Sequence, residues 1–359
     1  MTTVANYLSG VPGVLSTDDV ATTAAHVASL QSPNGQIPWF VGGHCDPWNH
    51  VEAAMALTVT GYCDEARAAY RWLDLNQLGD GSWFNYYVAD RVRDARLDTN
   101  VIAYVATGVY HYLLATDDVD FAASMWPCVD RAIEFVLRWQ KADGTIRWSL
   151  DALGRVESYS LLTGSSSIFH SLRCAAALGE RLDYARPSWE LAAARLGHAV
   201  SHHPGAFAPK NEFAMDWYYP VFSGALDGVA GQRRLDDGWE RHVMDGYGVR
   251  CVSTNDWVTA AETAECVLAL DALGLTSRAL DLFSFTGRHR RDDGAYWTGI
   301  AYPEGVTFPG LETTSYTAAA IILAADALTS SSPASGLFRH GNLAMPLDLA
   351  EPGCPLIRN

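Results

Sequence analysis

The sequence has no excess of basic residues, no apolar run of transmembrane length and no Cys-x-x-Cys pair. Its formal net charge of −16 disfavours nucleic acid or an anionic membrane as a partner, because both would repel it. The seven Cys residues are scattered and odd in number, so neither a disulfide framework nor a zinc knuckle is expected. Residues 1–13 lack the basic and apolar segments of a signal peptide. We therefore expect a cytoplasmic globular protein that spans no membrane.

Most motifs that indicate a cofactor are also missing. The sequence contains no Gly-x-Ser-x-Gly elbow, no P-loop and no dinucleotide fingerprint. We interpret none of its His residues as part of a metal site. We expect neither a metal ion nor another cofactor.

What the sequence does contain is a repeated turn around Gly, closed by an aromatic residue. The copies are Gln31-Ser-Pro-Asn-Gly-Gln-Ile-Pro-Trp39, Gln77-Leu-Gly-Asp-Gly-Ser-Trp83, Gln140-Lys-Ala-Asp-Gly-Thr-Ile-Arg-Trp148 and Asp292-Asp-Gly-Ala-Tyr-Trp297, with degenerate copies near His203-Pro-Gly205 and Gly246-Tyr-Gly248. A spacing of roughly 50–60 residues is typical of an array of helical hairpins. Because each hairpin needs its neighbours to bury its apolar face, we expect one all-α domain over residues 1–359. Six hairpins that close on themselves make an (α/α)6 toroid.

The expected helices alternate between a charged and a small, apolar type. Expected outer helices cover 17–31, 63–76, 119–140, 185–201, 232–245 and 275–288, and expected inner helices cover 47–60, 98–115, 160–178, 216–228, 257–273 and 313–328. Helices that are apolar on most sides belong in the interior. The links into the inner helices are long and those out of them are short, so all long links share one rim. Long links on a rigid scaffold are where binding and catalytic groups concentrate. After residue 329 we expect loop, with the end of the chain packed on the ring.

Polar and aromatic residues gather where the expected inner helices begin. Carboxylates and amides bind sugar hydroxyls, and aromatic faces stack on the apolar faces of a sugar ring. The candidates for substrate binding are His44, Trp48, Asn49, Asp98, Asn100, Asp216, Trp217, Tyr218, Asp256 and Trp257. Asp98, Asp216 and Asp256 could instead cap their helices. For Trp39, Trp83, Trp148 and Trp297 we favour the simpler interpretation that they close their turns against the core.

Two acids stand out as candidates for catalysis. Asp46 precedes Pro47 at the start of an inner helix, where it could also be a helix cap. Glu262 lies in the second turn of the expected helix 257–273, among small apolar residues. Acids are rarely buried without a partner or a task. Glu52 and Glu265 share this property and compete with Glu262, and a buried Arg could pair with any of the three.

Three classes of protein fit such a ring: isoprenoid enzymes (terpene cyclases and prenyltransferases), glycoside hydrolases and non-catalytic glycan-binding scaffolds. The stretch Gln77-Leu-Gly-Asp-Gly-Ser-Trp83 matches the turn of terpene cyclase repeats, but no Asp-x-Asp-Asp or Asp-Asp-x-x-Asp run accompanies it. A prenyltransferase would need an Asp, Cys and His zinc set, which has no evident counterpart. Glycoside hydrolysis needs only two carboxyl groups and no metal. A non-catalytic glycan-binding scaffold would need no acids on apolar inner helices. We favour the glycoside hydrolase.

Two segments resemble those of a known family. His44-Cys-Asp-Pro-Trp-Asn49 and Asn255-Asp-Trp-Val-Thr-Ala-Ala-Glu262 are similar to segments of the methylmannose polysaccharide hydrolases. These are cytoplasmic α/α-toroid endomannosidases that cut an α-1,4-linked, partly O-methylated mannose chain. The resemblance covers most of the chain, although its motifs are short. It implies that Asp46 and Glu262 are the catalytic pair and that Trp48 and Trp257 contact the sugar.

The expected reaction is metal-free hydrolysis by a general acid and a general base. The acid needs a raised pKa, and the base stays ionised to activate a water on the opposite face of the sugar. We assign Asp46 as the acid and Glu262 as the base, with the reverse assignment still open. Inversion at the anomeric carbon is expected only by analogy with other α/α-toroid glycosidases.

Overall fold

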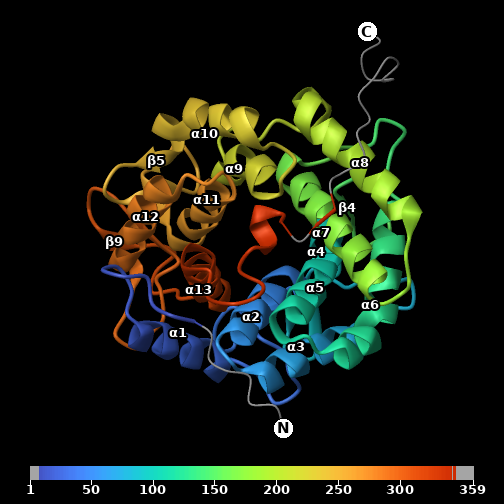
Figure 1. Cartoon of the computed structure of the whole chain (residues 1–359), viewed down its shortest axis with the longest axis horizontal. Coiled ribbons are helices and arrows are strands. Elements are labelled where there is room, and N and C mark those ends of the chain that lie inside the picture. Colours follow the sequence, from blue (N-terminus) through green and yellow to red (C-terminus); the bar gives the residue numbers. More distant parts are fainter. Residues whose placement is uncertain (1–7, 342, 345–359) are drawn as a thin grey trace.

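The computed structural model describes residues 8–341, 343 and 344, and within them the fold is mainly helical. Figure 1 shows the helices arranged as two concentric circles. The inner circle holds α2 (Pro47–Val59), α4 (Thr99–Ala103) with α5 (Val105–Thr116), α7 (Leu162–Arg181), α9 (Ala214–Phe222), α11 (Ala260–Ala272) and α13 (Ser315–Thr329). The outer circle holds α1 (Thr17–Ser29), α3 (Cys63–Asn76), α6 (Val119–Leu137), α8 (Pro187–His202), α10 (Gly228–His242) and α12 (Thr276–Ser284).

The inner helices contact one another in a continuous ring. α2 packs on α5, α5 on α7, α7 on α9, α9 on α11 and α11 on α13, and α13 returns to α2. They are buried on nearly every side: in α2 all residues but Trp48 and Asn49 are buried, and α13 is similar. Helices of this kind bury small apolar residues on all faces, which the expected inner helices show in sequence.

Three copies of the repeated turn fasten a hairpin to the next outer helix. The side-chain amide of Gln31 donates to the Gly35 carbonyl at 3.1 Å and to the Glu65 backbone carbonyl of α3 at 2.8 Å. Gln77 and Gln140 make the same pair of bonds, reaching Cys128 of α6 and Ala192 of α8. Each of these Gln side chains therefore donates to one backbone carbonyl of its own turn and to one of the neighbouring outer helix.

The glycine of each turn is required by close contact as well as by conformation. Gly35 has φ +93°, and a Cβ there would lie 2.3 Å from the Ala68 carbonyl oxygen of α3. Gly294, in the last copy, has φ +82°, and a Cβ would lie 2.5 Å from the carbonyl oxygen of Thr22 in α1. Because α1 is the first outer helix, this last copy joins the end of the array to its beginning.

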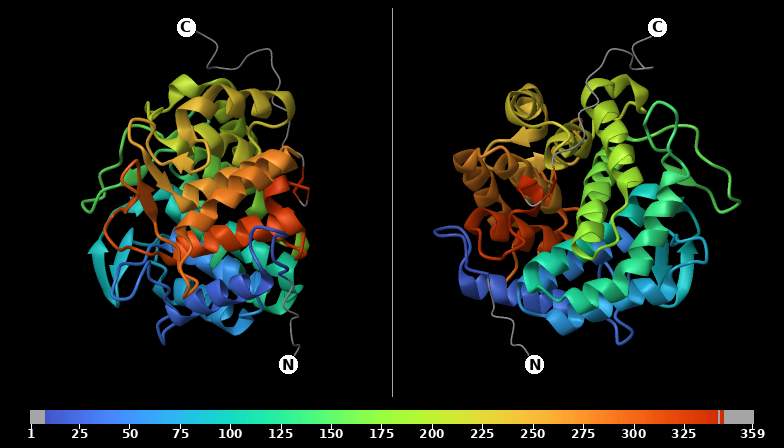
Figure 2. Two further views of the ribbon diagram at one scale, coloured as in Figure 1. Left: turned by 90° about the vertical axis from the view of Figure 1, so that its left-hand side faces the viewer. Right: turned by 45° about the vertical axis from the view of Figure 1, so that its right-hand side comes forward.

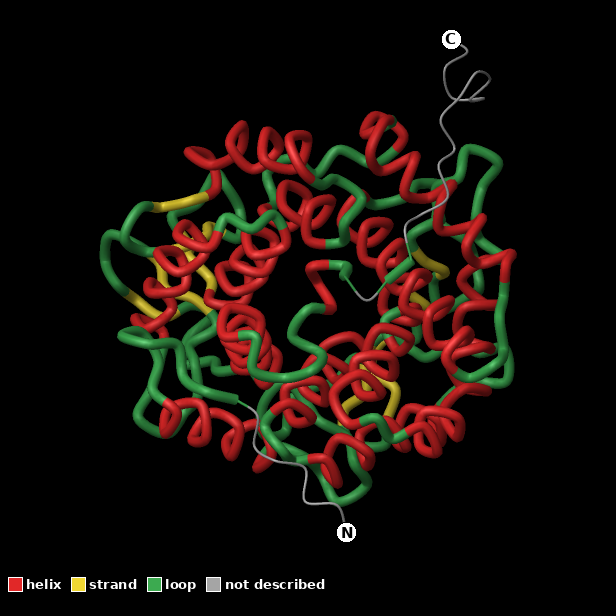
Figure 3. Tube along the Cα trace, in the orientation of Figure 1, coloured by secondary structure: helices red, strands yellow, loops and turns green. Residues whose placement is uncertain are grey.

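The long links contain strands, which an all-α expectation did not include. β1 (Tyr86–Val88) pairs with β2 (Arg91–Asp94), and β3 (Leu97–Asp98) pairs with β4 (Ser149–Leu150). A five-stranded antiparallel sheet follows the order β5 (Val243–Met244), β6 (Gly248–Arg250), β7 (Trp257–Thr259), β8 (Gly299–Ala301) and β9 (Val306–Thr307). Figure 2 shows these strands and the long links on one side of the ring, and Figure 3 shows the strands confined to the links.

The segment after α13 packs inside the ring and includes a short helix where only loop was expected. Its 3-10 helix η3 (Leu337–Arg339) lies within the inner circle and contacts α11. Phe338 stacks on Phe222 of α9 with ring centroids 4.5 Å apart, and Arg339 donates to Asp271 of α11 at 2.7 Å. Residues 1–7, 342 and 345–359, on which parts of the signal-peptide and chain-end expectations fall, lie outside the described residues.

Several expected boundaries need correction. The inner helix expected over 98–115 is divided at Tyr104 into α4 and α5, and the one expected over 257–273 begins at Ala260 because residues 257–259 form β7. The helix expected over 216–228 ends at Phe222, and the degenerate turn near Gly246 is the β5–β6 hairpin.

In the described part of the chain no helix is long and apolar enough to cross a membrane. The six described Cys residues are free thiols.

Candidate active site

Asp46 caps α2 and is at the same time a buried acceptor. Its Oδ1 accepts from the Asn49 backbone N–H at 2.9 Å, while Oδ2 accepts from the Asn49 amide at 2.7 Å and from the Trp39 indole N–H at 2.6 Å. The residue is 3% exposed. Burial raises the pKa of Asp46, and these three donors only partly offset the effect. The Asp46 carboxyl group is therefore both the cap of α2 and the candidate catalytic acid.

Aromatic rings surround this carboxyl on the side of the links. His44 lies against Trp39 with ring centroids 4.1 Å apart and against Tyr86 at 4.4 Å. Burial lowers the pKa of His44, and its Nε2 is buried without a hydrogen-bond partner among the described residues. Tyr316, on α13, packs edge-on against Trp39 at 4.9 Å. The expected residues His44, Asp46 and Asn49 therefore share one cluster.

Glu262 lies in the first turn of α11, one turn earlier than expected, and is half-buried. Its carboxyl group faces Cys251 and, together with burial, raises the pKa of that thiol. Burial raises the pKa of the Tyr316 phenol, and the negative charges of Glu262 and Asp46 raise it further. Since α13 lies between α2 and α11 in the ring, Tyr316 stands between the two candidate acids.

Two further acids lie deeper on the same two helices. Glu265 of α11 accepts hydrogen bonds from Tyr218 and, at 2.8 Å, from Tyr219. Glu52 of α2 accepts from Tyr104 at 3.4 Å. Both acids are less than 8% exposed. Burial raises the pKa of Glu265 to about 7 and that of Glu52 well above its ordinary value, with Glu265 as the second cause for Glu52.

Glu52, one of these two deeper acids, also borders Trp48. The Trp48 indole packs against Tyr104 and Tyr219, with ring centroids 5.7 and 6.1 Å apart. Its Nε1 is buried with no hydrogen-bond partner among the described residues, yet it lies close enough to Glu52 and Tyr104 to lower the pKa of each. The structure thus brings Trp48 and Tyr218 into one buried cluster with Glu52 and Glu265.

Asp98 repeats the arrangement of Asp46 on the next inner helix. It caps α4 through Oδ1, which accepts from the Asn100 backbone N–H at 2.9 Å, and its Oδ2 accepts from the Trp148 indole N–H at 2.5 Å. Burial raises the pKa of Asp98 to about 6. The Oδ1 of Asn100 is buried and has no partner within the described residues.

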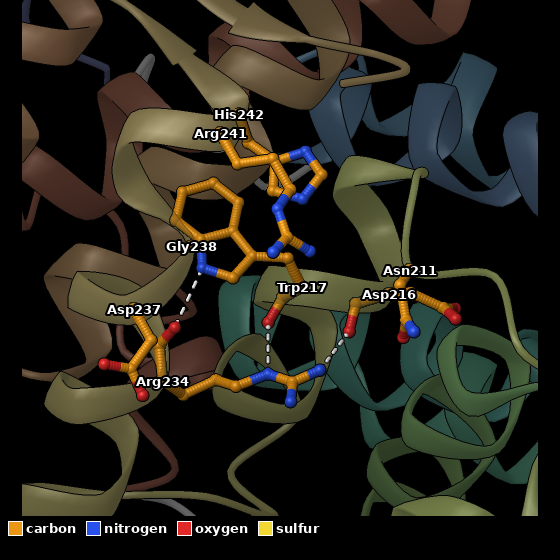
Figure 4. A pocket seen from close by; sticks show the side chains of 8 residues that line it. All are labelled: Asn211, Asp216, Trp217, Arg234, Asp237, Gly238, Arg241 and His242. Atoms are coloured by element: carbon orange, nitrogen blue, oxygen red, sulfur yellow. Dashed lines mark hydrogen bonds between the residues drawn. The ribbon is translucent and has the colours of Figure 1, made fainter. Parts of the chain in front are cut away.

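Asp216 and Trp217 line a separate cavity of about 180 Å³ beside α9 and α10 (Figure 4). Asp216 caps a neighbouring helix, since its Oδ1 accepts from the Thr163 backbone N–H of α7 at 3.1 Å. Trp217 is 4% exposed, donates to the Arg234 carbonyl at 2.9 Å and stacks on His242 at 5.1 Å. Its ring faces are therefore already covered by protein.

Asp256 and Trp257 lie on the five-stranded sheet. Asp256 is exposed, caps no helix and pairs with Arg250 at 2.8 Å. The Trp257 indole donates to the Phe308 carbonyl at 3.0 Å and packs edge-on against the Phe308 ring. Neither residue contacts the Asp46 or Glu52 clusters through any bond or ring contact found in the described chain.

Sequence reasoning misjudged the turn tryptophans. Trp83 does close its turn: it is fully buried and donates to the Leu73 carbonyl at 2.8 Å. Trp39 and Trp148 are half-buried and donate to acids instead. Aligning the copies on their glycines would have revealed this, because Trp83 then falls opposite the buried Ile37 and Ile146, two residues before the other tryptophans.

No metal site accompanies these acids. Across residues 8–341, 343 and 344, no group of three or more His, Cys, Asp or Glu residues could hold a metal ion. No ion pair to Glu52, Glu262 or Glu265 exists among the same residues, so the buried Arg partner considered for them is not found there.

Comparison with solved structures identifies the fold. A wild-type glycosidase superposes with a TM-score of 0.70 at 13% identity, covering 88% of this chain and 97% of its own. A GH63 mannosylglycerate hydrolase from Thermus thermophilus, solved with Tris and D-glycerate, gives 0.68 at 12% identity, covering 84% and 99%. A D-mannose isomerase gives 0.67 at 12% identity, covering 87% and 96%. At such identities the likeness shows the fold alone.

Comparison of sequences identifies the family. No protein-family model matches the chain. The chain is 48% identical over 339 residues to the MMP endo-(1,4)-3-O-methyl-alpha-D-mannosidase of Mycolicibacterium hassiacum, covering 94% of each. This relationship confirms the expected enzyme class, a glycoside hydrolase. The chain therefore belongs to the family that its two short segments resemble, the methylmannose polysaccharide hydrolases.

Proposed function

We propose that this protein is an endo-acting α-1,4-mannosidase that cleaves a 3-O-methylated mannose polysaccharide in the cytoplasm. The family relationship supports the substrate, since the Mycolicibacterium hassiacum relative is named for that linkage and that methyl group. We also propose that residues 1–359 form one (α/α)6 toroid domain, an interpretation supported by the closed circle of inner helices.

The observation that carries the mechanism is the environment of Asp46. A general acid must hold its proton near neutral pH, and burial raises the pKa of Asp46 in that direction. Glu262, half-buried on α11 two inner helices away, is the base that activates water. The reaction proceeds with inversion, for which the two carboxyl groups of such enzymes are roughly 6.5–9.5 Å apart. It uses no metal and no other cofactor.

Sugar contacts follow from the same clusters. His44, Trp48, Asn49, Asp98, Asn100 and Tyr218 lie around or below the acids and contact the sugar units next to the cleaved bond. His44 Nε2, Trp48 Nε1 and Asn100 Oδ1, which have no hydrogen-bond partner within the described part of the chain, support this, because buried polar atoms ordinarily have partners. Of the other candidates, Asp216, Asp256 and Trp257 contact only units further along the chain, and the covered ring of Trp217 leaves it no face for a sugar.

The test is to incubate the protein with 3-O-methylated and unmethylated α-1,4-linked manno-oligosaccharides and to determine the products by mass. We expect internal cleavage that persists after extensive chelation. Binding without cleavage would favour the glycan-binding scaffold. Cleavage that is lost with EDTA and restored by a divalent ion would overturn the metal-free mechanism. Turnover of an isoprenoid diphosphate would favour the terpene cyclase or prenyltransferase class.

A further inference from the structure

The ring interior holds two acids that the proposed reaction does not use. Glu52 and Glu265 lie below Asp46 and Glu262 on the same helices, α2 and α11. Isolated charges are expensive to bury, and the described residues supply no cation to either group. A task is therefore needed to explain why both acids are retained in the buried interior of the ring.

The hydrogen bonds divide the two acids into different protonation states. Glu265 accepts from two phenols, Tyr218 and Tyr219, one on each oxygen, which favours its ionised form. Glu52 has a single long bond, from Tyr104 at 3.4 Å. Two like charges near each other in a buried site cannot both form readily, so once Glu265 has ionised, above about pH 7, its negative charge keeps the proton on Glu52.

The other ionisable groups around Glu52 act in the same direction or are neutral. Asp46, on its own helix, raises the pKa of Glu52 as well, and Glu262 acts on Glu265 from one turn above. The remaining neighbours, from the junction of α4 and α5 and from α7 and α9, are neutral: burial raises the pKa values of the phenols Tyr104, Tyr218 and Tyr219 and of the thiol Cys174. Glu52 is thus a carboxylic acid with a proton to donate.

Most other donors in this cluster are already engaged. The phenols of Tyr218 and Tyr219 donate to Glu265, and that of Tyr104 donates to Glu52. The donors that remain are the Glu52 carboxyl proton and the Trp48 indole N–H, which lies near Glu52 and Tyr104 but forms no hydrogen bond within the described residues. Hydrogen-bond donors that no protein acceptor satisfies are suited to a ligand atom that accepts hydrogen bonds but cannot donate them.

An O-methyl group creates such an atom. Methylation turns a hydroxyl, which donates and accepts, into an ether oxygen that only accepts, so a carboxylate cannot bind it but a carboxylic acid or an indole N–H can. The methyl carbon needs an apolar surface, and the rings of Trp48, Tyr104 and Tyr219 meet beside Glu52 with centroids 5.7 and 6.1 Å from the Trp48 ring.

We propose that Trp48 and Glu52 select the methylated sugar by donating to its ether oxygen, with Tyr104 and Tyr219 enclosing the methyl carbon. This inference rests on the proposed function, because it names the groups that distinguish the methylated from the unmethylated substrate. Glu265 is a positioning residue whose charge keeps the proton on Glu52.

The experiment compares kcat/KM for two manno-oligosaccharides of equal length, one 3-O-methylated and one not. Trp48→Phe removes the N–H but keeps an aromatic ring, and should lower the methylated-to-unmethylated ratio about three- to tenfold, as expected for one lost hydrogen bond. Trp139→Phe is the matched control, since the Trp139 N–H is also buried without a partner among the described residues but lies at the end of α6. It should leave the ratio unchanged.

The pH dependence of the ratio tests Glu52 itself. In the wild type the preference for the methylated substrate should decline at alkaline pH, because Glu52 then loses its proton. Glu52→Gln keeps an N–H donor at every pH, so its ratio should be independent of pH. An unchanged ratio in Trp48→Phe, or a wild-type ratio that does not vary with pH, would overturn the proposal. Failure of the wild type to cleave either substrate would instead overturn the proposed function.

Discussion

The indole N–H of Trp39 donates to Asp46 Oδ2 at 2.6 Å, while Asp46 Oδ1 caps α2. The carboxyl group is thereby fixed by the helix on one oxygen and by a link residue on the other. Trp148 and Asp98 repeat this relationship at 2.5 Å on the next inner helix. A helix cap and a candidate catalytic acid are therefore compatible roles for one side chain.

Trp39→Phe should change the pH dependence of activity. The indole bond lowers the pKa of Asp46 against the raising effect of burial, so its loss should raise that pKa further. A hydrogen bond to a charged group is worth about 1.5–3 kcal/mol, or about one to two pKa units. If Asp46 is the acid, the alkaline limb of the kcat/KM profile should move to higher pH by about one unit.

The control for this change is Trp297→Phe. Trp297 follows the last turn, is half-buried and lies under the Arg291 guanidinium at 4.5 Å, and its indole makes no bond to an acid among the described residues. Its pH profile should match the wild type. An unshifted alkaline limb in Trp39→Phe would remove Asp46 from the role of acid.

Gly294→Ala tests whether the last turn joins the two ends of the array. The added Cβ would meet the Thr22 carbonyl at 2.5 Å, and φ is +82°, so the substitution should destabilise the protein by about 1–3 kcal/mol. Urea unfolding measures the change. Gly205→Ala, where a Cβ meets nothing within 4 Å and φ is not positive, should be within about 0.5 kcal/mol of the wild type. Equal midpoints for the two variants would contradict this account of the turn.

The sequence alone was sufficient to predict the hairpins and the positions of the inner helices. Repeated turns and small apolar residues report local structure, so the helix over residues 63–76 was predicted to the residue. The strands were not predicted, because segments as short as 2 or 3 residues carry no detectable alternation. The positions of Trp217 and Trp257 depend on packing against Gly238 and Gly299, which are distant in sequence. The covered ring of Trp217 could not be foreseen from neighbouring residues.

Glu265 should make stability depend on pH. Its pKa is about 7 in the folded protein and near its ordinary value of 4.5 in the unfolded chain. Between these values the folded state holds a proton that the unfolded state has released, so the free energy of unfolding should fall as pH rises from about 4.5 to 7.

Urea unfolding of the wild type and Glu265→Gln at several pH values measures this contribution. Gln cannot ionise, and it can still accept from one of the two tyrosines, so the variant should gain stability relative to the wild type as pH rises through this window. A constant difference between the two proteins would show that Glu265 is ionised throughout.

The most direct test of the proposed mechanism is the rate at which Asp46→Asn cleaves a 3-O-methylated α-1,4-linked manno-oligosaccharide. Asn still caps a helix, so the variant should fold and bind the glycan like the wild type. Loss of general acid assistance should lower turnover by about 10²–10⁴-fold, with product masses that otherwise match those of the wild type. Cleavage at nearly the wild-type rate would mean that Asp46 is only a cap, and Glu52 would then be the next acid to examine.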